Sequence, residues 1–210
     1  MHLLATNVSE GCLCSFNREG LWMISRDASR AFRVDRMPIG LATVSMAVAP
    51  SSAFPGLFPP LEVTGADVGA KHGEFGRKAY TDGGVFDNLG VRMFRFLAHL
   101  ATTDQQRPWD GVLVSDVGKP FEVQSAVRAG GLVRTALRAT DILMDRVWQL
   151  EIENFQDTFG FVFSPSIDVA GPHEDATALH PEVQRQAANI RTDLDAFSPL
   201  EISCLIRHGY

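Results

Sequence analysis

The sequence predicts an α/β protein with a central, mostly parallel sheet flanked by helices. Two observations lead to this fold class. Short apolar runs alternate with longer helical patterns along the chain, which is typical of α/β architectures. The run Trp109–Ser115 is apolar and bounded by turn residues, as in a strand that is buried on both faces within a parallel sheet. At 210 residues the chain is long enough for one domain, or for most of a larger one.

The N-terminal part predicts short strands. Leu3–Asn7 is expected to be a strand, Ser9–Gly11 a turn, and Cys12–Phe16 a returning strand. Leu21–Ile24 is another short apolar segment. Arg26–Arg36 is mixed and basic, and its spacing suits either a solvated helix face or a loop.

A helix is expected over Ile39–Ala49, opened by Pro38 in its first turn. The proline-rich loop Pro50–Pro60 follows and carries Phe54, Leu57 and Phe58. A rigid apolar loop of this kind can line a substrate pocket, but it can equally cap the core. Both interpretations stay open from the residues alone.

The remaining elements follow from periodicity and capping signals. Strands are expected at Leu61–Val63, Arg77–Thr81 and Phe159–Ser164, and helices at Gly90–Ala101, Glu122–Phe155, Glu182–Ile190 and Pro199–His208.

The segment Tyr80–Val91 leads from the expected strand Arg77–Thr81 into the expected helix Gly90–Ala101. It is rich in short, flexible and acidic residues. Asp82 is followed by Gly83 and Gly84, so no bulky neighbour shields its carboxylate on that side. Asp87 and Asn88 lie in the same loop. Catalytic groups of α/β enzymes often occupy such strand-to-helix connections, whereas a plain turn stabilised by Asp and Asn side chains is the alternative.

Charge and hydropathy exclude several classes of partner. The formal charge of −6 argues against nucleic acid or a polybasic membrane contact. No apolar run reaches the roughly 18 residues that span a bilayer, and no secretory signal is visible at the N-terminus.

The three cysteines, Cys12, Cys14 and Cys204, are too few and odd in number for a disulfide framework. We expect reduced packing residues, although Cys-x-Cys on one strand face leaves a metal or redox pair open. Reduced thiols favour a cytoplasmic location, and a secreted or membrane-associated parent protein is not excluded. Asp82 and Asp87 could also contact Mg²⁺ or Ca²⁺, but two carboxylates are too few for an all-protein Ca²⁺ site.

Several segments together resemble the patatin-like phospholipase family. Asp82-Gly-Gly, continued as Val-Phe-Asp-Asn-Leu-Gly, resembles its active-site aspartate motif, and Ala49–Pro60 resembles its proline-rich segment. Leu4-Ala-Thr-Asn resembles the strand before that segment, and the stretches 190–202 and 206–210 resemble the tail of bacterial members. The resemblance implies a patatin-like layered fold, incomplete at its N-terminus, with residues 1–210 forming a single partial domain.

The resemblance also implies a lipid acyl hydrolase that uses a Ser–Asp dyad and no metal or cofactor. A serine in a Gly-x-Ser-x-Gly turn attacks an ester carbonyl, and Asp82 takes its proton as general base. Gly83 and Gly84 would frame Asp82, Asp87 and Asn88 would hold the loop, and Phe54, Leu57 and Phe58 would contact the acyl chain. Phospholipids or other lipid esters are the expected substrates, with transient membrane-surface contact during lipid degradation.

Gly-x-Ser-x-Gly is absent from the 210 residues, and Ser51 and Ser52 lack the flanking glycines that it requires. The nucleophile is therefore expected outside this chain, and the isolated chain is expected to be inactive. The alternative function is a non-catalytic lipid-binding or regulatory module of the same fold.

Overall fold

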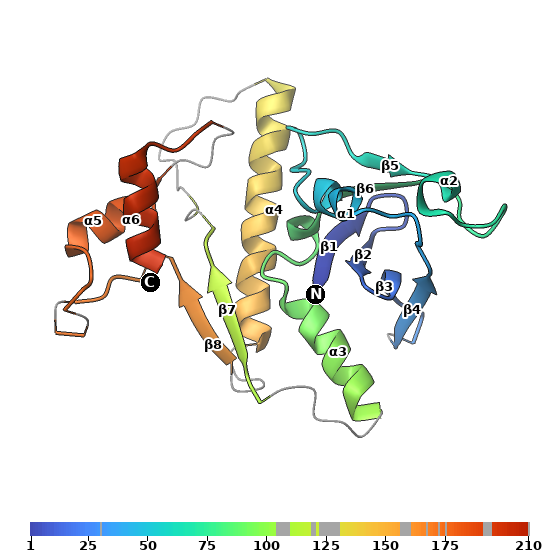
Figure 1. Cartoon of the computed structure of the whole chain (residues 1–210), viewed down its shortest axis with the longest axis horizontal. Coiled ribbons are helices and arrows are strands. Elements are labelled where there is room, and N and C mark those ends of the chain that lie inside the picture. The colour runs from blue at the N-terminus through green and yellow to red at the C-terminus, as the bar shows by residue number, and fades with distance from the viewer. Residues whose placement is uncertain are drawn as a thin grey trace. The chain divides into compact units, whose positions relative to one another are not determined.

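The computed structural model describes residues 1–29, 31–103, 110–118, 121, 131–155, 161–166, 168–171, 173–174, 176–190 and 195–209. The chain divides into two compact units (Figure 1). The first comprises Met1–Pro108 and Arg128–Phe155, and the second comprises Trp109–Val127 and Gln156–Tyr210. The expectation of one partial patatin-like domain stays a prediction.

A six-stranded sheet forms the centre of the first unit. Its strands are β1 (His2–Asn7), β2 (Cys12–Asn17), β3 (Gly20–Arg26), β4 (Phe32–Met37), β5 (Leu61–Val63) and β6 (Lys78–Asp82). They lie in the order β4-β3-β2-β1-β6-β5, and each of the five pairings is antiparallel. Strands β1 to β4 therefore form a meander, and β6 is inserted beside β1 from later in the chain.

The fold class predicted from the sequence, a central mostly parallel sheet in a patatin-like layered arrangement, is wrong. The connections at Ser9–Gly11 and Arg18–Glu19 are too short for the crossover that a parallel pair requires, so they force antiparallel hairpins. Asn7 stabilises the first turn, because its side-chain oxygen accepts the Ser9 and Glu10 amides at 2.9 and 3.2 Å. Among the strands that the structure describes, only β7 and β8 of the second unit pair in parallel.

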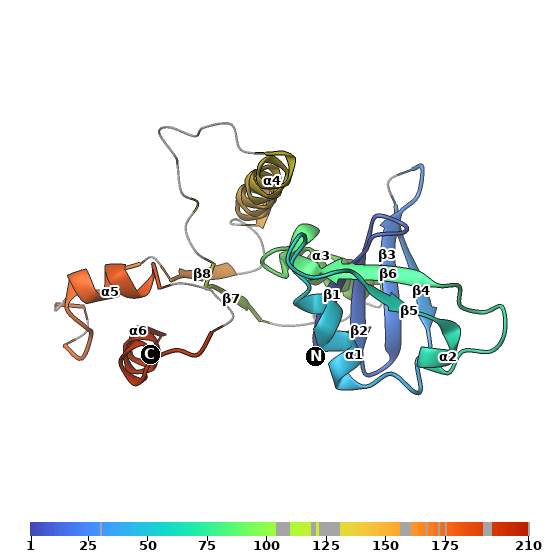
Figure 2. The same ribbon diagram turned by 90° about the horizontal axis from the view of Figure 1, so that it is seen from above.

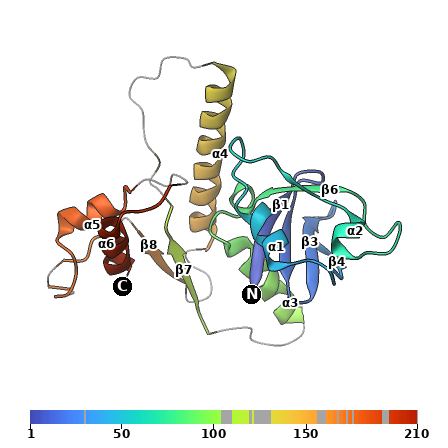
Figure 3. The same cartoon turned by 45° about the horizontal axis from the view of Figure 1, so that its top comes forward.

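Both faces of the six-stranded sheet are covered, because side chains alternate along each strand. On one face Ala5, Cys14 and Met23 pack with Ala47 of helix α1 (Val44–Ser51) and Val68 of helix α2 (Gly65–Val68). Figure 2 and Figure 3 show α1 beside β1.

On the other face Leu13, Trp22 and Ile24 pack with Met93 and Phe96 of helix α3 (Val91–Thr103). The expected helix at Gly90–Ala101 is therefore confirmed within a residue or two at each end. The sheet is sandwiched between helices of unequal length.

Two segments differ from the sequence expectation near α1. The helix begins at Val44 rather than at Ile39, because Thr43 caps it: its hydroxyl oxygen accepts the Met46 amide at 3.2 Å. Phe32–Met37, predicted as a helix face or loop, is the edge strand β4. Its charged residues suit an edge, where they discourage pairing with another chain.

Helix α4 (Leu132–Phe155) belongs to the first unit and contacts α3 and the short 3-10 helix η1 (Gly83–Val85) (Figure 1). The part of the predicted Glu122–Phe155 helix that precedes Gly131 lies outside the described residues. Of the described helices, none combines the length and apolar character needed to span a membrane.

The second unit contains the parallel pair β7 (Val112–Asp116) and β8 (Phe161–Pro165) with helices α5 (Pro181–Ala187) and α6 (Pro199–Gly209). Ser198 and Glu201 form a reciprocal cap on α6, which confirms the predicted helix start. Some residues of the predicted segments lie outside the described residues. They are Trp109 and residues 159–160 of the predicted strands, and residues 191–194 and 210 of the tail segments that resemble the family.

Candidate functional site

Asp82 is the last residue of β6, and two hydrogen bonds fix its main chain. Its amide donates to the Ala53 carbonyl at 3.1 Å, and its carbonyl accepts the Thr6 hydroxyl at 2.9 Å. The neighbouring Thr81 hydroxyl also donates to the Ala53 carbonyl, at 2.8 Å. The end of β6 is thereby tied both to β1 and to the loop that follows α1.

The Asp82 carboxylate is partly buried. Its Oδ1 accepts the Gly84 amide at 2.7 Å, and no donor to Oδ2 is present among the described residues. Desolvation raises the pKa of Asp82, and the Gly84 hydrogen bond offsets part of this rise. The arrangement orients one oxygen and leaves the other able to accept a proton.

Positions 83 and 84 are occupied by glycine because neighbouring atoms leave no space for a Cβ atom. A Cβ on Gly83 would lie 2.7 Å from the Leu4 carbonyl oxygen. A Cβ on Gly84 would lie 2.7 Å from Asn88 Oδ1 and 3.0 Å from Asp82 Oδ1. The short turn after β6 can therefore approach β1 and Asp82 only without side chains.

The proline-rich loop presents its apolar side chains unequally. Phe54 is half-buried, whereas Leu57 and Phe58 are 66% and 40% exposed. A tight turn forms here, because the Phe54 carbonyl accepts the amides of Leu57 and Phe58 at 3.2 and 3.1 Å. Gly56 faces Leu137 of α4. The loop is thus neither a buried cap nor a closed pocket wall.

Asp87 and Asn88 occupy different environments. Asn88 is exposed, whereas Asp87 is buried, and its Oδ2 accepts the Met93 amide near the start of α3 at 3.1 Å. The described residues contain no group of three or more His, Cys, Asp or Glu side chains that could hold a metal ion.

The pattern of residues in the sequence did not reveal Glu151 of α4, the buried partner of Asp87. Glu151 accepts the Leu89 amide at 3.2 Å and the Arg92 Nε–H at 3.1 Å. Burial, reinforced by the charge of Asp87, raises the pKa of Glu151 to about 8, and burial also raises the pKa of Asp87. At neutral pH Glu151 therefore keeps its proton.

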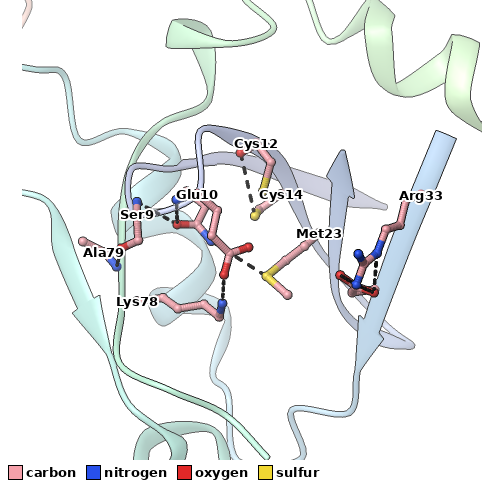
Figure 4. Close-up of polar contacts among 10 residues, drawn as sticks. Ser9, Glu10, Cys12, Cys14, Met23, Arg33, Lys78 and Ala79 are labelled. Atoms are coloured by element: carbon pink, nitrogen blue, oxygen red, sulfur yellow. Dashed lines mark hydrogen bonds and ion pairs between the residues drawn. The ribbon is translucent and has the colours of Figure 1, made fainter. Parts of the chain in front are cut away.

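The Cys12 and Cys14 thiols lie in the core beneath α1, and all three cysteines are free. The Cys14 thiol donates to the Cys12 carbonyl at 4.0 Å (Figure 4). The hydrogen bond to Cys12 and burial raise the pKa of the Cys14 thiol. Figure 4 also shows Glu10 paired with Lys78 beside them. The contact with Cys14 lowers the pKa of the Cys12 thiol. Both side chains are buried in the core, as is typical of packing residues.

Comparisons with protein-family models, with curated proteins and with solved structures found no match.

Proposed function

We propose that Asp82 is the general base of a lipid acyl hydrolase in which a serine, supplied from outside these 210 residues, is the nucleophile. The observation that carries the proposal is the state of the Asp82 carboxylate: partly desolvated, fixed through Oδ1, and without a donor to Oδ2 in the described structure. The serine hydroxyl would donate to Oδ2 and transfer its proton there as it attacks the ester carbonyl.

Partial desolvation supports this role. A fully solvated aspartate is a weak base at neutral pH, and desolvation raises its basicity towards the working pH. The Gly84 amide limits the rise while it orients the carboxyl plane. A direct Ser–Asp transfer also needs no intermediate histidine, and no described histidine hydrogen-bonds to Asp82.

The loop anchored beside Asp82 supports an apolar substrate. The Ala53 carbonyl accepts hydrogen bonds from both Thr81 and Asp82, so the loop is attached to the end of β6. Leu57 and Phe58 are exposed a few residues away along this loop. They would contact the acyl chain of a phospholipid or another lipid ester.

The test measures hydrolysis of p-nitrophenyl butyrate by two preparations: the 210 residues alone, and the same residues within the longest reading frame that encodes them. We expect no turnover by the first. In the second, Asp82→Asn should lower kcat by at least a hundredfold, whereas Asp35→Asn, a change to another aspartate on the same sheet, should leave it unchanged.

Retention of most of the activity by the Asp82→Asn variant would contradict the proposal. Absence of a Gly-x-Ser-x-Gly turn from the longer reading frame, combined with no turnover, would do so as well. Turnover by the 210 residues alone that is lost with Ser51→Ala or Ser52→Ala would place the nucleophile inside this chain instead.

A further inference from the structure

A cavity of about 500 Å³ lies within the first unit, apart from Asp82. It is bounded by the ends of β2 and β3, by Phe86, by α3 and by the C-terminal end of α4. Neither Asp82, Gly83 nor Gly84 lines it. Its size is within the range of small-molecule sites in proteins.

Three arginines line the cavity, and each lies over a phenylalanine that also lines it. The Cζ atoms of Arg26, Arg92 and Arg95 are 4.5, 5.4 and 5.8 Å from the ring centroids. The rings are those of Phe32, Phe86 and Phe155 respectively. Stacking on a ring holds a guanidinium in place.

The charges around the cavity leave a positive excess. Of the two carboxyl groups that line it, Glu10 pairs with Lys78, and Glu151, which keeps its proton at neutral pH, accepts the Arg92 Nε–H. In the described part of the chain, Arg95 has no carboxylate within ion-pair distance. Arg26, at the end of β3, is another cation of the lining. An anionic group therefore gains from entering the cavity.

The remaining walls are apolar. Leu13, Ile24 and Leu150 line the cavity together with the three phenylalanine rings. Burial of an aliphatic chain against these side chains contributes about 25 cal/mol for each Å² of apolar surface removed from water. The cavity thus combines cationic groups with an apolar lining.

We propose that this cavity binds a small amphipathic anion, an alkyl chain with an anionic head group, with the head group at Arg26 and Arg95 and the chain against the phenylalanine rings. The site does not depend on the chemistry of Asp82. Carboxylates and phosphate monoesters both carry such head groups, and guanidinium groups bind either one through charge-assisted hydrogen bonds.

The test is isothermal titration calorimetry of the 210-residue chain at pH 7 with decanoate, decyl phosphate and decanol. We expect saturable binding of one or both anions, and binding of decanol at least tenfold weaker. Preference between decanoate and decyl phosphate identifies the head group. Arg26→Gln and Arg95→Gln should each weaken anion binding about tenfold, because each removes a charge-assisted contact.

Arg36→Gln is the matched control. Arg36 also lies over an aromatic ring, with its Cζ 4.5 Å from the Trp22 centroid, but it does not line the cavity. This variant should change the affinity less than twofold. Asn154→Trp, at an exposed helix position that lines the cavity, should abolish binding by filling the space without changing the charge.

Circular dichroism on each variant establishes that it is folded, and the arginine and tryptophan variants test the site independently of one another. The proposal is overturned if neither anion binds saturably at millimolar concentration. It is overturned equally if decanol binds as tightly as the anions, if Arg36→Gln weakens binding as much as Arg95→Gln, or if Asn154→Trp leaves the affinity unchanged.

Discussion

The carboxyl groups of Asp87 and Glu151, which are 64 positions apart in the sequence, interact electrostatically in the buried contact between α4 and the loop before α3. Asp87 Oδ1 is buried and has no hydrogen-bond partner in the described structure. A proton on Glu151 would give this oxygen a donor. Two like charges so close and so buried would repel each other, so one proton stays with the pair at neutral pH.

This pair makes stability depend on pH. The pKa of Glu151 is about 8 in the folded chain and 4.5 ordinarily. Between these values the unfolded chain has released the proton and the folded chain retains it, so the free energy of unfolding falls as pH rises from about 4.5 to 8. Each pKa unit corresponds to about 1.4 kcal/mol, so urea denaturation across this range should show a decrease of at most about 5 kcal/mol attributable to the pair.

Glu151→Gln should flatten this dependence. The amide can donate to Asp87 Oδ1 without titrating, and its oxygen can still accept from Arg92 or Leu89. Glu153→Gln, at an exposed position of the same helix, is the control. In this variant the free energy of unfolding should change with pH as it does in the wild-type chain. An unchanged slope in Glu151→Gln would show that the pair is not the titrating element.

The sequence predicts local features of this fold better than it predicts which strands become neighbours. The Ser198 cap, the β5 strand at Leu61–Val63 and the glycine turn after Asp82 depend on residues close in sequence, and the structure contains them. The short connections between β1, β2 and β3 are also local, and they make these pairings antiparallel. The insertion of β6 beside β1 instead depends on segments that are distant in sequence.

Glu151 illustrates the second limit of sequence reasoning. A glutamate in a helix is normally solvated, and nothing in the residues around position 151 distinguishes it from Glu153. Its role arises because α4 packs against the loop that contains Asp87 and Leu89. Asp87 was predicted to hold the loop that contains it, and its actual partners come from α3 and α4.

Gly83 should be intolerant of a side chain. A Cβ at Gly83 would lie 2.7 Å from a backbone oxygen of β1, which cannot move without disturbing the sheet. Gly83→Ala should therefore lower the free energy of unfolding by about 1–3 kcal/mol. Gly76→Ala, where no atom lies within 4 Å of the added Cβ, should change it by less than about 0.5 kcal/mol in the same denaturation experiment. Equal stability of the two variants would contradict the tight approach of the turn to β1.

Thr81 should stabilise the fold through the hydrogen bond from its hydroxyl to the loop that contains Ala53, rather than through its methyl group. Its hydroxyl is buried and donates to the Ala53 carbonyl at 2.8 Å. Thr81→Val keeps the shape and removes this donor, so the free energy of unfolding should fall by about 1–2 kcal/mol. Thr81→Ser, which keeps the hydroxyl, should retain the hydrogen bond. Amide hydrogen exchange should accelerate at Asp82, whose amide bonds the same carbonyl, in Thr81→Val and not in Thr81→Ser.

Asp82 offers a test of the proposed base that needs no substrate. Desolvation should make its carboxyl group titrate above the ordinary value of 3.8, and the ¹³C chemical shift of the carboxyl carbon measures this directly. The Gly84 amide proton should shift over the same pH range, because it bonds to Oδ1.

Since the folded pKa is raised, the ionised Asp82 lowers stability as pH rises above about 3.8. Asp82→Asn still accepts the Gly84 hydrogen bond but carries no charge. At pH 7 this variant should be as stable as the wild-type chain or more stable by less than about 1 kcal/mol, because the carboxylate is only partly buried. Below pH 3.8 the difference should vanish. A titration midpoint below 3.8, or a marked loss of stability in Asp82→Asn at pH 7, would mean that the carboxylate is stabilised by its surroundings and is therefore poorly suited to accept a proton.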